Sequence, residues 1–587
     1  MTPHTFEIGA HDFLLDGEPH RVISGALHYF RIHPDQWRER IRMGRMMGLN
    51  TIETYVAWNE HAPEPGVFDT TGRLDLARFL REVQEEGMQA IVRPGPYICA
   101  EFDGGGFPAW LLRDPEVGVR TLEPRYMAAV GEYLRQVMAI VAPLQIDRGG
   151  PVIMLQVENE YGAYGSDHAY LRALTDLFLD AGATVPLTTV DQPMDDMLAA
   201  GNIPELHATG SFGSRATERL AALRRQQATG PLMCSEFWCG WFDHWGAHHH
   251  VTDAAASARE LDDLLSAGAS VNIYMLHGGT NFGLTNGAND KGVYQPTVTS
   301  YDYDAPLDEA GRPTEKFWAF REVISRYAPV PEFARVERAA FAVPAPAPLR
   351  PVGALADLVA PDWQAHDEVP TMDALGISRG LARYRVELDH GPGAGVLAFA
   401  EVRDRAWVTL DGVPVGVLAR EDHAWTITLP RGEGVLEVLV EDEGRVNYGP
   451  RIGEPKGLIG PATFDGVAVT GWTASAVPLD AFASGSSLQL APEEAPLTAG
   501  AHVFEATVSL DEPGDLALST DGWGKGLVWI NGFCLGRYWR SGPQRTLFVP
   551  APATRAGENV VTVLEFEALR ERTVRFLGDL DLGHTEF

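Results

Sequence analysis

Residues 76–97, LARFLREVQEEGMQAIVRPGPY, decide the fold because they contain a helix and the strand that follows it. The apolar positions fall at i, i+3, i+4 and i+7 of one helix face: Leu76, Phe79, Leu80 and Val83. Gly87 supplies a C-terminal stop for that helix. The strand is apolar at nearly every position, as in a parallel sheet that is covered on both faces. The stretch therefore predicts one unit of a repeated β/α fold.

The same alternation of short apolar runs and helix-patterned stretches extends from about residue 20 to residue 325. The candidate strands number eight and cover residues 21–30, 50–58, 89–97, 152–160, 186–191, 205–212, 232–237 and 270–276. Pro34 predicts the start of a helix ahead of Trp37, and Gly48 predicts its end. Eight β/α units in about 300 residues are typical of a (β/α)8 TIM barrel.

The composition changes beyond this region. Proline and alanine alternate from Val343 to Pro351, and short alternating segments such as RAWVTLDGVPVGVL follow at the spacing of sandwich strands. The serines of 484–487 and the prolines of 492–496 indicate a second boundary. We expect a TIM barrel over 1–330, a Pro/Ala-rich linker over 331–352, a first β-sandwich domain over 353–485 and a second over 486–587. Strand exchange between the two β domains is left open.

Charge and hydropathy exclude several classes of partner. The net charge of −33 repels phosphate backbones and anionic lipid surfaces, so neither nucleic acid nor a membrane is an expected partner. The N-terminal MTPHTFEIGAHDFLLDG has no basic region followed by an apolar run, and no stretch approaches the roughly 18 apolar residues of a membrane span. We therefore expect a cytoplasmic protein. Its four cysteines are too few and too scattered for a disulfide framework, which predicts free thiols.

Polar residues close several of the predicted strands. In TIM barrels the chemistry lies at the C-terminal strand ends. The second, third, fourth and seventh strands end IETYVAWNEH, RPGPYICAEFDGGG, LQVENEYG and MCSEFWCGWFDHWG. Hydrolysis of a glycosidic bond needs one carboxyl to protonate the leaving oxygen and a second on the other side of the anomeric carbon. Glu160 and Glu236 fit these roles, because strands four and seven face each other across the barrel mouth.

Each of these residues also has a purely structural interpretation. A lone glutamate at a strand end is often paired with a barrel arginine, but Asn159 beside Glu160 suits a sugar hydroxyl. Trp241 and Trp245, which follow Glu236, suit sugar faces, although core packing is the alternative. A cluster of histidines with Asp243 could suggest a metal site, but adjacent histidines point in different directions, so we expect a wet loop near the active site: His244, His248, His249 and His250. Cys234 and Cys239, on either side of Glu236, are expected to be packing residues.

Eight ordered motifs run along essentially the whole chain: SGALHYFRI, TIETYVAWNEHAPEPGVFDTTG, RPGPYICAEFDGGGFPAWLL, QVENEYGAYG, CSEFWCGWFDHWG, NIYMLHGGTNFG, SYDYDAPLDEAG and GWGKGLVWINGFCLGRYW. Through them the chain resembles the glycoside hydrolase family 35 β-galactosidases, in particular the compact bacterial members. The resemblance implies a TIM barrel followed by two all-β domains, the second a galactose-binding-like jelly roll. It implies no metal and no organic cofactor.

The resemblance also implies roles for individual residues. Glu160, the second glutamate of QVENEYG, matches the acid/base, and Glu236 matches the nucleophile, whereas Glu158 is not catalytic. The motifs that hold the galactosyl ring map onto Tyr55, Cys99, Ala100, Glu101, Asn159 and Tyr303. Tyr303 is favoured over the nearby Tyr301 and is suited to hydrogen-bond the nucleophile. Tyr448 in EGRVNYGPRIGEPKGLIG matches an aglycone contact, with a packed strand tyrosine as the alternative.

These roles imply a retaining exo-β-galactosidase that acts by double displacement on a β-galactoside oligosaccharide or glycan. The two carboxyls are then expected about 5 to 5.5 Å apart, with the pKa of Glu160 above that of Glu236. By analogy with the compact bacterial members we expect a preference for β-1,3 linkages. The alternatives are a related barrel enzyme acting on another sugar, such as a β-glucosaminide, and a non-catalytic galactose-binding protein. The oligomeric state is left open between a monomer and a homodimer.

Overall fold

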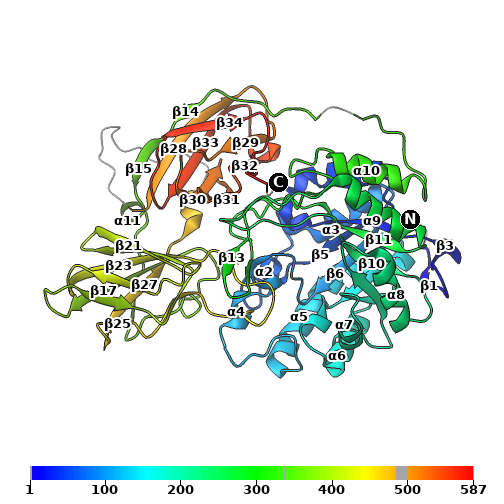
Figure 1. Ribbon diagram of the computed structural model, residues 1–587, viewed down its shortest axis with the longest axis horizontal. Helices are drawn as coiled ribbons and strands as arrows, with labels where there is room; N and C mark the ends of the chain where they lie inside the picture. The colour runs from blue at the N-terminus through cyan, green and yellow to red at the C-terminus, as the bar shows by residue number, and fades with distance from the viewer. Residues whose placement is uncertain (1–2, 336–337, 484–499, 586–587) are drawn as a thin grey trace.

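The computed structural model describes residues 3–335, 338–483 and 500–585 of the chain (Figure 1). All eight predicted strands are present and close into a parallel barrel, in which the last strand pairs with the first. In barrel order they are β4 (Ile23–Leu27), β5 (Thr51–Tyr55), β6 (Gln89–Gly95), β7 (Val152–Val157), β8 (Leu187–Asp191), β9 (His207–Ser211), β10 (Met233–Trp238) and β11 (Ser270–His277). A small sheet precedes the barrel: β1 (Phe6–Ile8), β2 (Phe13–Leu15) and β3 (Glu18–His20).

Helices surround the barrel and bury the faces that the sequence pattern indicates. They are α1 (Trp37–Met47), α3 (Leu76–Glu85), α5 (Pro124–Val141), α6 (His168–Asp180), α7 (Asp195–Gly201), α8 (Ala216–Gln226), α9 (Ala254–Ser266) and α10 (Glu315–Ile324), with short helices α2 (Trp58–His61) and α4 (Ala109–Leu112) in the loops. The four predicted positions are the buried ones of α3, and the Asp75 side chain caps its N-terminus by accepting from Arg78 N. Gly48, with φ of 106°, ends α1 as predicted.

The first β domain packs two sheets around one apolar core, in which Trp472 is fully buried. The larger sheet has the order β16 (Gln364–His366), β27 (Trp472–Ala476), β17 (Leu381–Asp389), β23 (Glu433–Glu441), β20 (Arg405–Leu410) and β21 (Val413–Ala419). The smaller sheet has the order β22 (Thr426–Leu429), β18 (Gly395–Ala398), β25 (Thr463–Phe464) and β26 (Val467–Ala468). A separate pair joins β19 (Glu401–Arg403) to β24 (Gly457–Ile459).

The second β domain is also a pair of sheets, and it corrects the predicted linker. One sheet has the order β15 (Arg350–Ala354), β28 (His502–Leu510), β33 (Gly557–Glu565), β30 (Lys525–Ile530) and β31 (Phe533–Trp539). The other has the order β14 (Ala347–Pro348), β34 (Thr573–Leu577), β29 (Leu516–Ser519) and β32 (Thr546–Val549). The end of the 331–352 segment is therefore not linker, because β14 and β15 belong to this domain. The chain then builds the first β domain, past the short helix α11 (Leu355–Leu358), and returns.

Proline explains why these two strands resemble a linker in the sequence. Pro348 and Pro351 lack a backbone N–H and are tolerated in β14 and β15 because both strands lie at the edge of their sheets. The domain boundary predicted from 484–487 and 492–496 lies outside the described residues. Within the described ranges no helix combines the length and the apolar character needed to cross a membrane.

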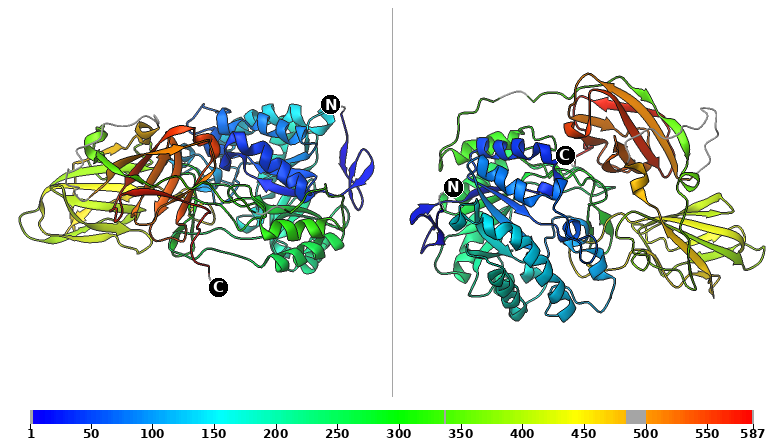
Figure 2. Two further views of the ribbon diagram at one scale, coloured as in Figure 1. Left: turned by 90° about the horizontal axis from the view of Figure 1, so that it is seen from above. Right: turned by 180° about the vertical axis from the view of Figure 1, so that it is seen from behind.

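The three domains meet beside the barrel mouth, and both views of Figure 2 place the β domains on one side of the barrel. A hairpin of β12 (Ala288–Asp290) and β13 (Tyr294–Pro296) follows the barrel strands and bridges to the first β domain, where Tyr294 Oη donates to Gly444 O at 2.6 Å. Arg537 of the second β domain donates to Glu441 Oε1 and to Asn286 Oδ1, each at 2.6 Å. These buried polar contacts fix loops of both β domains against the barrel.

Candidate active site

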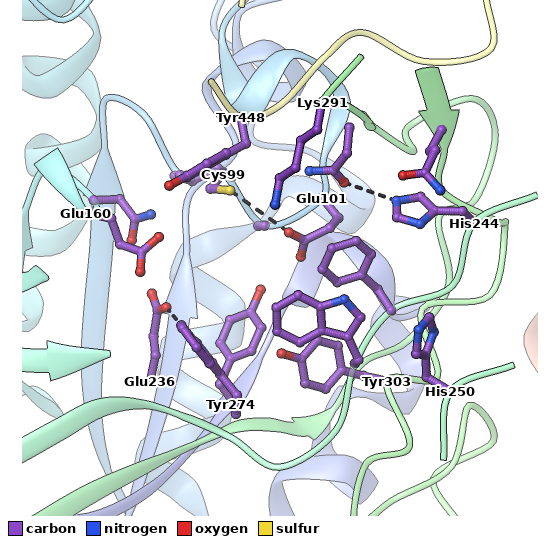
Figure 3. Close-up of a pocket in the computed structure, with 18 of the residues that line it drawn as sticks. Cys99, Glu101, Glu160, Glu236, His244, His250, Tyr274, Lys291, Tyr303 and Tyr448 are labelled. Atoms are coloured by element: carbon purple, nitrogen blue, oxygen red, sulfur yellow. Dashed lines mark hydrogen bonds between the residues drawn. The ribbon is translucent and has the colours of Figure 1, made fainter. Parts of the chain in front are cut away.

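A cavity of about 500 Å³ opens at the C-terminal ends of the barrel strands. All ten residues that were predicted to act on substrate line this one cavity: Tyr55, Cys99, Ala100, Glu101, Asn159, Glu160, Glu236, Trp241, Tyr303 and Tyr448. Figure 3 shows the carboxyl groups of Glu160 and Glu236 pointing toward one another. The volume is that of a small-ligand site. Sequence motifs from the barrel and from the first β domain thus converge on a single pocket.

Glu236 lies on β10 and is held by donors on both of its oxygens. Oε1 accepts from Tyr55 Oη at 2.8 Å and from Arg93 at 2.5 Å, while Oε2 accepts from Ser211 Oγ at 2.8 Å. Burial by itself would raise the pKa of Glu236, but the Arg93 charge and these hydrogen bonds outweigh it and hold the pKa below its ordinary value. Glu236 is therefore an oriented carboxylate, as a nucleophile requires.

Glu160 follows β7 in a left-handed turn, with φ of 45°. Its Oε1 is buried and, among the described residues, has no hydrogen-bond partner. Burial, followed by the negative charge of Glu236, raises the pKa of Glu160 to about 7. One carboxyl of the pair is thus suited to carry a proton at neutral pH and the other to be ionised, which is the division of roles that glycoside hydrolysis needs.

Arg93 links the two sides of the pair, and the sequence pattern did not identify it. This fully buried side chain on β6 donates to Glu236, to Asn159 Oδ1 and, at 3.2 Å, to Glu53 Oε1. Its charge stabilises the carboxylate of Glu236, while its contact with Asn159 orients the amide beside Glu160. The available signal was a charged residue inside an apolar strand, just before the strand-end motif PGPY.

The hydrogen bond to the nucleophile comes from Tyr55, not from Tyr303 as predicted. Among the described residues Tyr303 makes no hydrogen bond to Glu236 and instead packs edge-on against Tyr274, with ring centroids 5.2 Å apart. Tyr303 has a φ of 62°, in the left-handed region, and this backbone conformation was not readable from the sequence. Tyr303 still lines the cavity, whereas Tyr301 is fully buried, is not among the lining residues and donates to Glu101 Oε2 at 2.5 Å.

The loop after β6 presents three consecutive residues with left-handed backbone: Cys99, Ala100 and Glu101, with φ of 55°, 55° and 48°. Non-glycine residues rarely adopt this conformation, and a run of them is typical of functional loops that the surroundings hold in place. Arg31 supplies part of that support by donating to Ala100 O at 2.7 Å. Burial raises the pKa of Glu101 to about 7, so its carboxyl can offer a proton as well as accept one.

Glu158 lies outside the cavity, although it is two residues from Glu160. Arg120 holds it through two hydrogen bonds of 2.9 and 2.7 Å, and Tyr170 Oη donates to it at 3.0 Å. The salt-bridge interpretation of an acidic strand end therefore applies to Glu158. Neither Glu158 nor Arg120 lines the pocket.

The structure places Trp241, Trp245 and the histidine cluster that follow Glu236 in the sequence. Trp241 lines the cavity with 38% of its surface exposed, whereas Trp245 is buried in a cluster with Val298 and Trp539 and serves packing. Within the described residues no group of three or more histidine, cysteine or acidic side chains is arranged to hold a metal ion. Asp243 instead pairs with His249 and His250, and three histidines line the rim of the cavity: His244, His248 and His250.

All four cysteines are free, as predicted, and Cys234 and Cys239 are buried packing residues beside the nucleophile. Further cavity residues were missed in the sequence. Gln192 directly follows β8, so the strand-end rule that identified the glutamates also applied to it. Lys291 lies between β12 and β13, and no pattern in the sequence connected that segment to the barrel mouth.

Replacing Tyr55 by phenylalanine tests the support of the nucleophile. A hydrogen bond to a charged acceptor contributes about 1.5 to 3 kcal/mol, so we expect Tyr55→Phe to lower kcat about 10- to 100-fold. Tyr274→Phe is the matched control, because Tyr274 lines the same cavity but bonds to Tyr301 at 3.0 Å rather than to Glu236. Equal kcat values for the two variants would contradict the assignment.

Comparison with known proteins gives consistent matches over the three domains. The sequence profile described as "Glycosyl hydrolases family 35" matches residues 12–327, "Beta-galactosidase, first all-beta domain" matches 370–480, and "Beta-galactosidase, galactose-binding domain" matches 502–559. The "Beta-galactosidase" of Mus musculus is 39% identical over 97% of this chain and 92% of its own length. That of Xanthomonas manihotis is 39% identical over 94% and 92%, and that of Homo sapiens is 40% identical over 96% and 88%.

Proposed function

The chain belongs to glycosyl hydrolase family 35, and we propose that it is an exo-acting β-galactosidase that cleaves terminal non-reducing β-galactosides with retention of configuration. The observation that carries the proposal is the opposed pair in the cavity: donors that include Tyr55, Arg93 and Ser211 hold Glu236 as a carboxylate, and Glu160 has a raised pKa. Relatives named beta-galactosidase, which align over nearly the whole chain, support the choice of galactose.

The proposed reaction has two steps. In the first, an oxygen of Glu236 forms a bond to the anomeric carbon, the bond from that carbon to the aglycone oxygen breaks, and the proton of Glu160 passes to that oxygen. In the second, water attacks the same carbon from the opposite face, gives a proton to Glu160 and releases Glu236. Two inversions give net retention. Arg93, Tyr55 and Ser211 stabilise the carboxylate that leaves in the second step.

The pH dependence of kcat/KM follows from the two pKa shifts. Glu160 must be protonated in the first step, and its pKa of about 7 means that activity falls as the pH rises through about 7. Glu236 must be ionised, and its lowered pKa places the acidic loss of activity below the ordinary glutamate value of about 4.3. We therefore expect a bell-shaped profile from a pH series of kcat/KM. An alkaline limb above about pH 9 would contradict the role of Glu160.

Substrate choice separates galactose from the other sugars considered. Rates on 4-nitrophenyl β-galactoside, β-glucoside and β-glucosaminide should favour the galactoside; equal or faster turnover of either other sugar would reject galactose specificity. We further propose the β-1,3 linkage as the preferred one, by analogy with the compact bacterial members that the sequence resembles. Matched β-1,3, β-1,4 and β-1,6 galactosyl disaccharides test it. A galactose-binding protein without activity would hydrolyse none of them.

A further inference from the structure

Lysine use in this chain singles out one residue. Of the 47 lysines and arginines only four are lysines. Three of these are buried and lie in ion pairs: Lys316 with Asp304 at 2.7 Å, Lys456 with Asp442 at 3.3 Å and Lys525 with Glu441 at 2.6 Å. The fourth, Lys291, is exposed, has no salt-bridge partner among the described residues, and lines the active-site cavity. Its charge is therefore available to a ligand.

The hairpin that carries Lys291 is fixed in place on both sides. The neighbouring Asp290 pairs with Arg420 of the first β domain at 2.9 Å and accepts the backbone N–H of Gly292 at 3.0 Å. On the other side of the turn, Tyr294 is buried and bonded to Gly444 and to Asp404. These contacts hold the backbone on both sides of Lys291 in place beside the cavity that the residue lines.

Among the described residues that line the cavity, Lys291 is the only lysine or arginine. The acidic side chains of the lining are Glu101, Glu160 and Glu236, which serve the galactosyl ring and the reaction. In the view of Figure 3, Tyr448 lies between Glu160 and Lys291. Glu101 and Asn159, which are expected to hold the ring, are buried, whereas Lys291 is exposed, and in an exo-acting enzyme the leaving group extends from the buried ring toward solvent. The lysine thus belongs to the aglycone side of the cavity.

We propose that Lys291 selects galactosides whose aglycone carries an anionic group, a carboxylate or a sulfate. An ammonium offers three donors and a full charge to such a group. The surrounding protein, with a net charge of −33, repels anionic glycans at long range, and a cation at the mouth offsets that repulsion where the aglycone binds. This inference rests on the proposed β-galactosidase activity.

The test compares two disaccharides that differ by one carboxylate. Galactose is β-linked to glucose or to glucuronate in the same position, using the linkage that the enzyme cleaves fastest, and kcat/KM is measured for both at low ionic strength. We expect the wild type to favour the glucuronate about three- to tenfold, the range of a partly exposed ion pair. Lys291→Ala should abolish this preference, Lys291→Glu should reverse it, and Lys291→Arg should retain it. Sodium chloride at 0.5 M should weaken the wild-type preference by screening, with a Debye length below about 8 Å.

Two controls separate the role of Lys291 from a general effect of net charge and from damage to the catalytic centre. Arg135→Ala removes one positive charge from the exposed face of α5, outside the cavity, and should leave the preference unchanged. Hydrolysis of 4-nitrophenyl β-galactoside measures damage to the catalytic centre in each Lys291 variant, and the preference is the ratio of the two disaccharide kcat/KM values, from which such damage cancels. If the wild type failed to hydrolyse this substrate, the proposed function itself would be rejected. Equal losses on both disaccharides, no wild-type preference, or hydrolysis of neither would overturn the selection of anionic aglycones.

Discussion

Glu236→Gln is expected to lower kcat on 4-nitrophenyl β-galactoside at least about 10⁴-fold while leaving galactose binding within a few-fold of wild type. The amide keeps the shape of the carboxylate but cannot supply the negative oxygen that bonds to the anomeric carbon. Tyr55, Arg93 and Ser211 would remain around it, so the pocket keeps its form. Turnover gives kcat, and calorimetry with galactose gives the binding constant.

Glu158→Gln is the matched control for that variant. Glu158 is a buried glutamate that directly follows the barrel strand β7, but it pairs with Arg120 outside the cavity. Breaking a buried pair costs about 3 to 5 kcal/mol, so this variant should unfold at a lower temperature while its folded fraction keeps most of its kcat. If Glu236→Gln hydrolysed the substrate normally, the assignment of the nucleophile would be wrong. If Glu158→Gln lost activity without losing stability, the purely structural role of Glu158 would be wrong.

Glu160→Ala is expected to have the second largest effect, and the size of that effect should depend on the leaving group. A general acid contributes about 10²- to 10⁴-fold, so kcat/KM on a disaccharide should fall by that factor. Dinitrophenolate leaves without protonation, so kcat/KM on 2,4-dinitrophenyl β-galactoside should fall far less. Azide should restore turnover and give β-galactosyl azide, because it replaces the water that Glu160 activates. Product analysis by NMR identifies the azide and its anomeric configuration.

The opposite pattern would contradict the acid/base role. Equal loss on both substrates, with no azide product, would mean that Glu160 orients the sugar and does not transfer a proton. Asn159→Ala provides a comparison, since this neighbour lines the cavity and bonds to Arg93 but has no titratable group. Its loss should be similar for both leaving groups, and azide should not rescue it.

The barrel was predictable because each strand and helix carries a local signal. The α3 face is apolar at helical spacing, and every barrel strand is a short apolar run, so periodicity alone located all eight. β14 and β15 were not predictable, because the local sequence of each indicates a linker and not a strand. Their prolines are turn and linker signals locally, and only pairing with β34 and β28, more than a hundred residues away, makes them strands.

The site was predictable where function coincides with a strand end, and not where it depends on tertiary geometry. Glu160 follows shortly after β7 and Glu236 lies near the end of β10, and such positions are at the barrel mouth. The choice of Tyr55 over Tyr303 as donor to the nucleophile depends on backbone conformation, and Lys291 reaches the cavity only because its hairpin is held between domains. Sequence spacing contains neither piece of information.

Covalent trapping tests the central claim that Glu236 is the nucleophile of a retaining β-galactosidase. A 2-deoxy-2-fluoro-β-galactosyl fluoride slows both steps, but its good leaving group lets the glycosyl-enzyme accumulate. Intact-mass spectrometry should show one fluorogalactosyl group per chain, and peptide mapping should place it on Glu236 in the CSEFWCGW peptide. A label on any other residue, or no label from an enzyme that releases α-galactose, would contradict the account.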